Sequence, residues 1–247
     1  MTTVTLAPSL LQPVPYVNGS IISWASNTTL SITAGKCLDS TNTFDIVTSA
    51  ATLDGSKVDL NALDTGALAA STCYYIYAIG SSLNNAAPAH LISASRTAPV
   101  LPVNYDLYKM VGVAFTDGST HFVKIYQSGN GNTRVYTYDT LPVVLNAGTQ
   151  TSYTAVALGA VLPVQDNLLI NLQASYTPAV AANVFSVRPS GSTATVVVTG
   201  TGVVAAKAQN LSINAVAKLL SNVPNIEYLV TASDALTLSL VSFTLFV

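Results

Sequence analysis

The chain has 247 residues, half of them apolar, yet charged residues make up only 8% of it, against about 25% in typical globular proteins. The nine Lys and Arg are scattered and the formal net charge is −2, so no nucleic-acid partner is expected. A surface of Ser, Thr, Asn and Gln is easily desolvated, which favours a protein packed against other subunits. The alternative is a secreted or surface β-protein that tolerates low charge.

No membrane insertion is expected. The longest apolar stretch, 155–164, contains Gly159 and Pro163 and is shorter than the ~20 residues that a spanning helix needs. The first four residues lack the basic start of a secretory signal. We therefore expect synthesis in the cytoplasm, where Cys37 and Cys73 would be two free thiols rather than a disulfide. The sequence leaves their pairing open.

The chain is expected to begin with an extended arm. Residues 1–29 contain Pro8, Pro13 and Pro15, and proline without a repeat favours extended chain over helix. Such an arm could reach a neighbouring subunit or lie along its own domain.

The first half of the chain is rich in strand patterns. Residues 74–79 carry β-branched and aromatic side chains on both faces, as in a strand covered on each side. Three further strands are predicted at 110–115, 122–126 and 134–138, which would form a β-meander. The Asp117-Gly118 pair would supply the positive φ of the first hairpin, and residues 128–132 would form the second turn.

The second half begins after a connector of residues 140–142 and 146–148. Between residues 205 and 220 the pattern favours a strand first, with a short helix possible at 215–220. At the C-terminus, Leu236, Leu238 and Leu240 alternate with polar residues, and the phase then shifts by one residue. This shift predicts a β-bulge at Leu240-Val241, or else two strands broken by a bend.

These patterns predict an all-β protein built from antiparallel β-sandwich or barrel domains. The expected division is the arm at 1–29, a first β-domain at 30–139 and a jelly-roll-like sandwich domain at 140–247.

Three segments of the first half carry a more specific pattern, namely 39–46 (DSTNTFDI), 63–79 (LDTGALAASTCYYIYAI) and 99–112 (PVLPVNYDLYKMVG), with FTDGS at 115–119. Their order resembles a β-rich module of tailed-bacteriophage virion proteins, among them decoration proteins of the particle surface and tail-fibre proteins. Two positions depart from that family, because Cys73 replaces its usual Trp and Lys109-Met110 its arginine pair. Segments 188–192 and 228–233 resemble β-sandwich ends of phage surface proteins. The resemblance implies a place on a virion, commonly as a trimer, in head or tail.

The same residues suggest a scaffold. Asp64-Thr65-Gly66 predicts a turn in which the Asp side chain bonds the following backbone. Gly112 inside a strand predicts the close approach of another backbone or a large ring. The tyrosines are expected at a core edge or a subunit interface, as Tyr74, Tyr75, Tyr77 and Tyr108.

Catalytic chemistry is not expected. His90 and His121 lack a partner motif and are interpreted as surface or edge residues. Residues 200–205 loosely mimic a dinucleotide fingerprint, but a hairpin turn is preferred. Asp39, Asn42 and Asp45 lack the spacing of a calcium loop, which favours turn chemistry. The sequence therefore nominates no catalytic, cofactor or metal residue and no cofactor, and leaves the binding residues unassigned.

Three hypotheses follow. The first is a non-enzymatic capsid decoration or cement protein, a homotrimer that contacts the major capsid protein on the head. The second is a tail-fibre or receptor-binding component that contacts a host surface glycan, although no cluster of Trp, Tyr and Asp marks a sugar site and the only tryptophan, Trp24, falls in the predicted arm. The third, an enzyme acting on cell-wall glycan, is disfavoured because Glu227 is the only glutamate.

Overall fold

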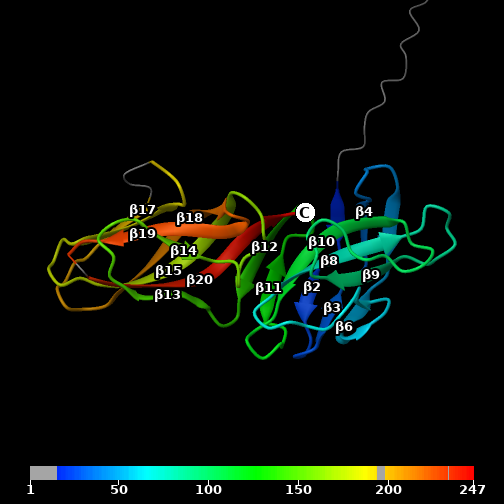
Figure 1. The fold of residues 1–247 in the computed structure, drawn as a ribbon, viewed down its shortest axis with the longest axis horizontal. Helices are drawn as coiled ribbons and strands as arrows, with labels where there is room; N and C mark the ends of the chain where they lie inside the picture. The colour runs from blue at the N-terminus through cyan, green and yellow to red at the C-terminus, as the bar shows by residue number, and fades with distance from the viewer. Residues whose placement is uncertain (1–15, 194–197, 233) are drawn as a thin grey trace, which may run out of the picture.

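The computed structural model describes residues 16–193, 198–232 and 234–247, and these residues form strands and loops without a helix. The all-β class is therefore confirmed. The possible short helix at 215–220 is wrong, because these residues continue the strand Gln209–Leu220 to its end. The molecule is elongated, with the strands of the two halves of the chain gathered toward opposite ends (Figure 1).

In the first half of the chain, the described residues from Tyr16 onward form twelve strands. In chain order they are β1 (Val17–Gly19), β2 (Ile22–Trp24), β3 (Thr29–Ile32), β4 (Gly35–Leu38), β5 (Asp45–Thr48), β6 (Ala51–Val58), β7 (Ala62–Leu63), β8 (Cys73–Gly80), β9 (Ala89–Ser93), β10 (Leu107–Phe115), β11 (Ile125–Ser128) and β12 (Thr133–Tyr138).

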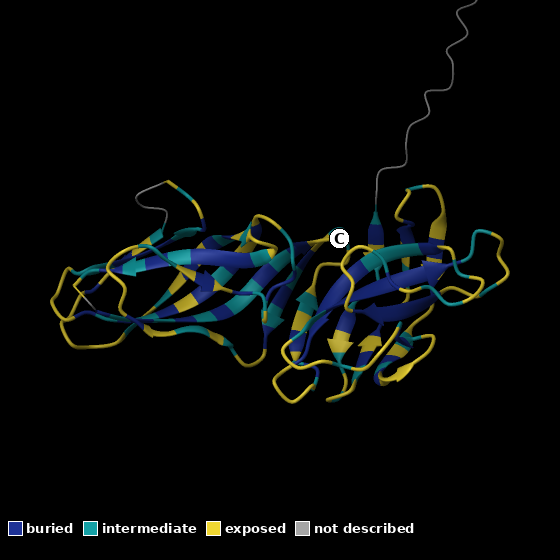
Figure 2. Ribbon diagram, viewed as in Figure 1, coloured by how far each residue is buried: buried dark blue, intermediate teal, exposed yellow. Residues whose placement is uncertain are grey.

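Strand β8 is covered on both faces, as its sequence predicts, and almost all of it is buried (Figure 2). Tyr75 and Tyr77 on one face belong to a core shared with the C-terminal half, whereas Tyr74 and Ile76 on the other belong to a separate N-terminal core. On its two edges β8 pairs with β9 and β10. Because side chains alternate along a strand, one strand can form the wall between two cores.

The predicted meander is only partly right. Strands β11 and β12 do form a hairpin, but β10 pairs with β8, and the other edge of β11 contacts β2 at Tyr126↔Ser23. The turn after β10 also differs, since the positive φ falls at Thr120 and not at Gly118. A single bridge, Thr116↔Phe122, closes this turn directly after the end of β10. Long-range pairing with β2 and β8 thus replaces the local pairing expected from the sequence.

In the second half, the residues that the structure describes form eight strands arranged as a β-sandwich. They are β13 (Val143–Gly148), β14 (Thr154–Ala157), β15 (Leu168–Thr177), β16 (Val184–Pro189), β17 (Val198–Thr201), β18 (Gln209–Leu220), β19 (Val223–Val230) and β20 (Ala235–Phe246). One layer contains β13, β20, β15 and β18, and the other contains β14, β19, β16 and β17. Part of the predicted connector, 146–148, lies within β13.

The predicted bulge in β20 is confirmed. Opposite this strand, Leu172 pairs with Leu240 and the neighbouring Asn171 pairs with Ser242, so Val241 has no counterpart. Leu238 and Leu240 before the bulge, and Phe243 and Leu245 after it, are all buried. The extra residue keeps both halves of the strand facing the same core.

Strand pairing connects the predicted arm with the first domain, and it also crosses the predicted domain boundary. From Val17 to Trp24 the arm forms β1 and β2, which pair with β4 and β3, so this part is folded into the N-terminal sheets. Residues 1–15 of the arm lie outside the described residues. Strand β12 pairs with β20 across the expected boundary at 139/140, and one hydrophobic core contains residues from both sides of it. The boundary and the jelly-roll topology stay predictions.

Candidate binding surfaces

An aromatic groove lies where β2 and β11 meet. Trp24 ends β2, and Tyr126 on β11 pairs with the preceding residue, Ser23, so the side chains of Trp24 and Tyr126 project from opposite faces of the strand pair. Two hollows of about 190 and 440 Å³ share Trp24 and Lys124 in their walls, and Tyr126 lines the smaller one. Tyr126 is 53% exposed, although most tyrosines of this chain are buried. We call this surface the Trp24 groove and include in it Asn27, Asp117 and His121, which line the larger hollow.

Hydrogen bonds hold the tryptophan in place. The indole N–H of Trp24 donates to the carbonyl oxygen of Phe122 at 2.9 Å. In return, the backbone N–H of Phe122 donates to the carbonyl oxygen of Asn27 at 2.7 Å. The β2–β3 turn and the loop after β10 are therefore tied together around the ring, although they are far apart in the sequence.

Asp117 and Lys124 line the groove, and Asp139 lies next to Lys124. Asp117 accepts hydrogen bonds from the backbone N–H groups of Ser119 and His121, at 2.8 and 2.9 Å, and these bonds lower its pKa. Lys124 Nζ lies 3.5 Å from Asp139 Oδ1 and 5.5 Å from the centre of the Tyr126 ring. The Tyr126 hydroxyl donates to Asp139 at 2.7 Å, which lowers the pKa of that carboxyl.

The Trp24 groove corrects the sequence-based view of the aromatics. Trp24 lies in β2, so this part of the predicted arm lies along its own domain, and the fold brings Trp24 into the walls of the hollows that Tyr126 and Asp117 line, residues about a hundred positions away in the chain. No local motif links these residues. A signal that could have directed attention there is that Trp24 is the chain's only tryptophan, since an isolated large aromatic at a strand end often lies at an interface.

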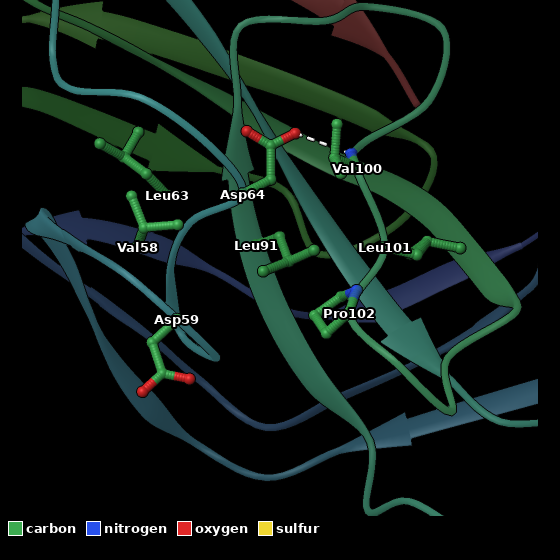
Figure 3. A pocket seen from close by; sticks show the side chains of 8 residues that line it. All are labelled: Val58, Asp59, Leu63, Asp64, Leu91, Val100, Leu101 and Pro102. Atoms are coloured by element: carbon green, nitrogen blue, oxygen red, sulfur yellow. Dashed lines mark hydrogen bonds between the residues drawn. The ribbon is translucent and has the colours of Figure 1, made fainter.

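A second surface is an apolar pocket of about 220 Å³ on the N-terminal part (Figure 3). Its walls come from the ends of β6, β7 and β9 and from the loop before β10, and they consist of Val58, Asp59, Leu63, Asp64, Leu91, Val100, Leu101 and Pro102. The Asp64 carboxylate accepts a hydrogen bond from the backbone N–H of Val100 at 2.9 Å. The predicted local turn bond of Asp64 is thus replaced by one that fixes a distant loop.

His90 is not the surface or edge residue that its sequence context suggests. It lies in β9 and is 1% exposed. Within the described part of the chain, neither of its ring nitrogens has a hydrogen-bond partner, and burial lowers its pKa to about 4. His121, by contrast, is half-buried and lies 3.8 Å from Asp117 at the Trp24 groove.

Two of the residues considered as calcium ligands, Asp39 and Asp45, form a turn and an ion pair in the structure. Asp39 accepts hydrogen bonds from the backbone N–H groups of Thr41, Thr43 and Phe44. Burial alone would raise the pKa of Asp39, but these bonds outweigh burial and lower it. Asp45 instead pairs with Lys36 at 2.8 Å. In the described ranges, no three His, Cys, Asp or Glu side chains gather as a metal site.

The remaining candidates also have structural positions. Residues 200–201 end β17, a strand of an antiparallel hairpin with β16, so no helix follows the glycine pattern there. Glu227 forms a 2.7 Å ion pair with Arg188, whose guanidinium lies 3.5 Å from the centre of the Tyr153 ring.

The cysteines are free thiols, and burial raises the pKa of Cys37 to about 12 and also raises that of Cys73. Such thiols are un-ionised at neutral pH and therefore poor nucleophiles.

Comparisons with known proteins found no matching family model, no similar curated protein and no similar solved structure. Over the described residues, no helix is long and apolar enough to cross a membrane.

Proposed function

We propose that this chain is a non-enzymatic structural protein of a bacteriophage virion that decorates the head and stabilises its lattice. The resemblance to phage virion proteins supports this proposal. Segments 63–79 and 99–112, on which the resemblance rests, contain most of β8 and much of β10. These two strands pair with each other. The segments quoted for the resemblance are therefore neighbours in space as well as in sequence.

The observation that carries the proposal is an exposed apolar patch around the pocket of Figure 3. Val58 and Val100 on the pocket wall are 54% and 60% exposed, and the nearby Leu60 and Val103 are 40% and 86% exposed. We call these four residues the valine patch. Covering exposed apolar area of this kind with another protein lowers the free energy of the complex. The low charge of the chain makes its surroundings easy to desolvate.

The proposed partners are sister copies in a homotrimer and the major capsid protein. The protein would be made in the host cytoplasm and reside on the virion. In a homotrimer one surface of each subunit contacts a different surface of the next subunit, and the valine patch can supply one of these two surfaces.

Copy number per particle tests the location. Quantitative mass spectrometry of purified particles should give hundreds of copies for a head protein, because head surfaces repeat their lattice sites many times. A count of about a dozen or fewer would contradict head decoration and favour the tail-fibre role.

Heat resistance tests the role. Capsids stripped of this protein should regain heat resistance when the purified chain is added back. The double variant Val58→Asn/Val100→Asn should rebind weakly, whereas the matched control Leu83→Asn, at a site that is 79% exposed in another loop, should rebind like the original. No protection by the original chain would reject the decoration role, and equal protection by both variants would reject the valine patch as the contact.

A further inference from the structure

We propose that the valine patch of one copy of this chain is covered by residues 1–15 of a second copy. The inference rests on the proposed function, since it names the segment that contacts the same patch in the homotrimer. Three features support it, namely the character of the pocket, the composition of residues 1–15 and the place where the described chain begins.

The pocket at the valine patch suits apolar side chains. Leu63 and Leu91, which line it, are 2% and 0% exposed, whereas Val58 and Val100, which also line it, are more than half exposed. The leucines therefore form its inner wall and the valines its outer wall. Its volume of about 220 Å³ is below the ~300–1,000 Å³ of usual small-molecule sites. It therefore suits one or two side chains of another polypeptide better than a separate small molecule.

Hydrogen bonds hold the walls of the pocket in place. The Asp64 carboxylate accepts the backbone N–H of Val100 at 2.9 Å, the bond drawn in Figure 3. The Asp59 carboxylate accepts the backbone N–H of Leu60 at 2.7 Å. Each of the two stretches that carry the patch is thus tied to a carboxylate. A surface that is already ordered loses little conformational entropy when a partner binds.

The composition of residues 1–15 (MTTVTLAPSLLQPVP) matches this pocket. The segment contains no charged side chain and three prolines, and its larger aliphatic residues are Val4, Leu6, Leu10, Leu11 and Val14. An uncharged segment can enter an apolar pocket without the cost of desolvating a charge. Proline fixes φ and so reduces the entropy that an extended segment loses on binding.

The described chain begins on a different surface from the patch. The Tyr16 hydroxyl donates to Asp45, and the Tyr16 carbonyl oxygen accepts the backbone N–H of Leu38 at 3.2 Å. Residues 1–15 are therefore joined to the sheet of β1, β4 and β5. In Figure 1, β1 and β6, the strand that ends at Val58, lie on opposite sides of the N-terminal part. Two different surfaces of one subunit are what a head-to-tail ring requires.

The segment is long enough to reach a neighbour. Fifteen extended residues span up to about 50 Å, whereas a compact domain of 100 residues has a radius of gyration of roughly 13 Å. Residues 1–15 can therefore cross from one subunit to the patch of the next. Contact with the patch of the same chain would require them to pass around the N-terminal part, and labelled copies distinguish these two arrangements.

Self-association of the purified full-length protein, without capsids, is the first test. Sedimentation velocity over a range of concentrations should show an oligomer that forms as the concentration rises. The variants Leu10→Asn/Leu11→Asn and Val100→Asn should each weaken association at least about tenfold, because each removes apolar area from the contact.

Matched controls separate the contact from a general effect of asparagine. Thr2→Asn/Thr3→Asn changes two polar residues of the same segment. Val180→Asn changes a valine in a loop of the second half that is 61% exposed, against 60% for Val100. Both controls should associate like the original. Circular dichroism and thermal unfolding verify that the variants are folded, and Val58→Asn replaces Val100→Asn if that variant is not.

Cross-linking identifies the contact directly. Gln12→p-benzoylphenylalanine places a photoreactive group next to Leu11 and leaves both leucines intact. This variant is mixed in equal amounts with a copy labelled with ¹⁵N and is then irradiated. Mass spectrometry of the peptides should find position 12 joined to residues 58–64 or 99–103, in pairs that combine labelled and unlabelled chains.

Three outcomes would overturn the proposal. They are a protein that stays monomeric at every concentration, association that is unchanged in the folded variants of the segment and the patch, and cross-links that fall within one chain or away from the patch. The decoration role would survive each of these results if the added protein still protects stripped capsids. Failure of that capsid assay would reject decoration and leave the contact between copies standing.

Discussion

Arg134 Nη1 donates a 2.7 Å hydrogen bond to the carbonyl oxygen of Ser20, and both residues are buried. The same guanidinium donates to the carbonyl oxygens of Gly19 and Gly131, at 2.8 and 3.1 Å. One side chain on β12 thus satisfies three backbone acceptors, two of them in the β1–β2 turn. Burial disfavours a charge unless it is hydrogen-bonded in this way, and burial lowers the pKa of Arg134.

Replacing Arg134 should destabilise the protein strongly. Arg134→Met keeps the length of the side chain but leaves the carbonyl groups of Gly19 and Ser20 without this donor, which should cost about 3 kcal/mol in the free energy of unfolding. Urea denaturation measures the change. Arg96→Met, at an exposed position, should shift the stability by less than about 0.5 kcal/mol. Equal effects of the two substitutions would contradict the role given to Arg134.

His90 should make stability depend on pH. Burial holds its pKa at about 4, against 6.5 for the ordinary group, so the unfolded chain binds the proton more tightly than the folded chain. Stability is therefore full above pH 6.5, falls as the pH drops below that value and levels off below 4. Between pH 7 and 5 the loss should be about 2 kcal/mol.

Denaturant titrations at several pH values test this dependence. His90→Leu should flatten the curve between pH 7 and 5. The carboxyls with lowered pKa values, such as the buried Asp39 and the partly buried Glu227, contribute mainly at lower pH. A pH slope that persists in His90→Leu would refute the assignment.

Gly112 in β10 should not accept a side chain. A Cβ there would lie 2.4 Å from Ile22 Cδ1 and 2.6 Å from the Tyr136 hydroxyl, which confirms the predicted close approach of a large ring. Gly112→Ala should therefore cost about 1–3 kcal/mol through overpacking. At Gly118, nothing lies within 4 Å of the added Cβ, so Gly118→Ala should be close to neutral. Thermal unfolding of the pair distinguishes a packing effect from a general glycine effect.

Because of the bulge in β20, deletion of Val241 and deletion of Ser239 should affect the stability of the protein differently. Without Val241, the strand would alternate regularly, and Leu240 and Phe243 would still face the core opposite Leu172 and Ile170. Without Ser239, the leucines on one side of the deletion would turn away from the core. We expect the Val241 deletion to unfold cooperatively and the Ser239 deletion to lose its cooperative transition. Calorimetry of both proteins measures this, and the opposite order would refute the bulge.

Local sequence determined which segments are strands and which of their faces are buried. The two apolar faces of β8 and the phase shift at Val241 are both confirmed. These features follow from the period of two along an extended chain, which depends only on neighbouring residues. The all-β class of the described residues follows from the same patterns, whereas the short helix allowed at 215–220 does not form.

Only the tertiary structure decided which strands pair and what the pairing brings together. The pairing of β11 with β2 places Tyr126 opposite Ser23, and the burial of β9 encloses His90. The hydrogen bond from Val100 to Asp64 likewise joins distant loops. Every strand edge presents the same backbone N–H and C=O groups, so these groups alone do not select the partner strand. The packing of whole sheets selects it. A groove built from residues a hundred positions apart therefore leaves no pattern in the sequence.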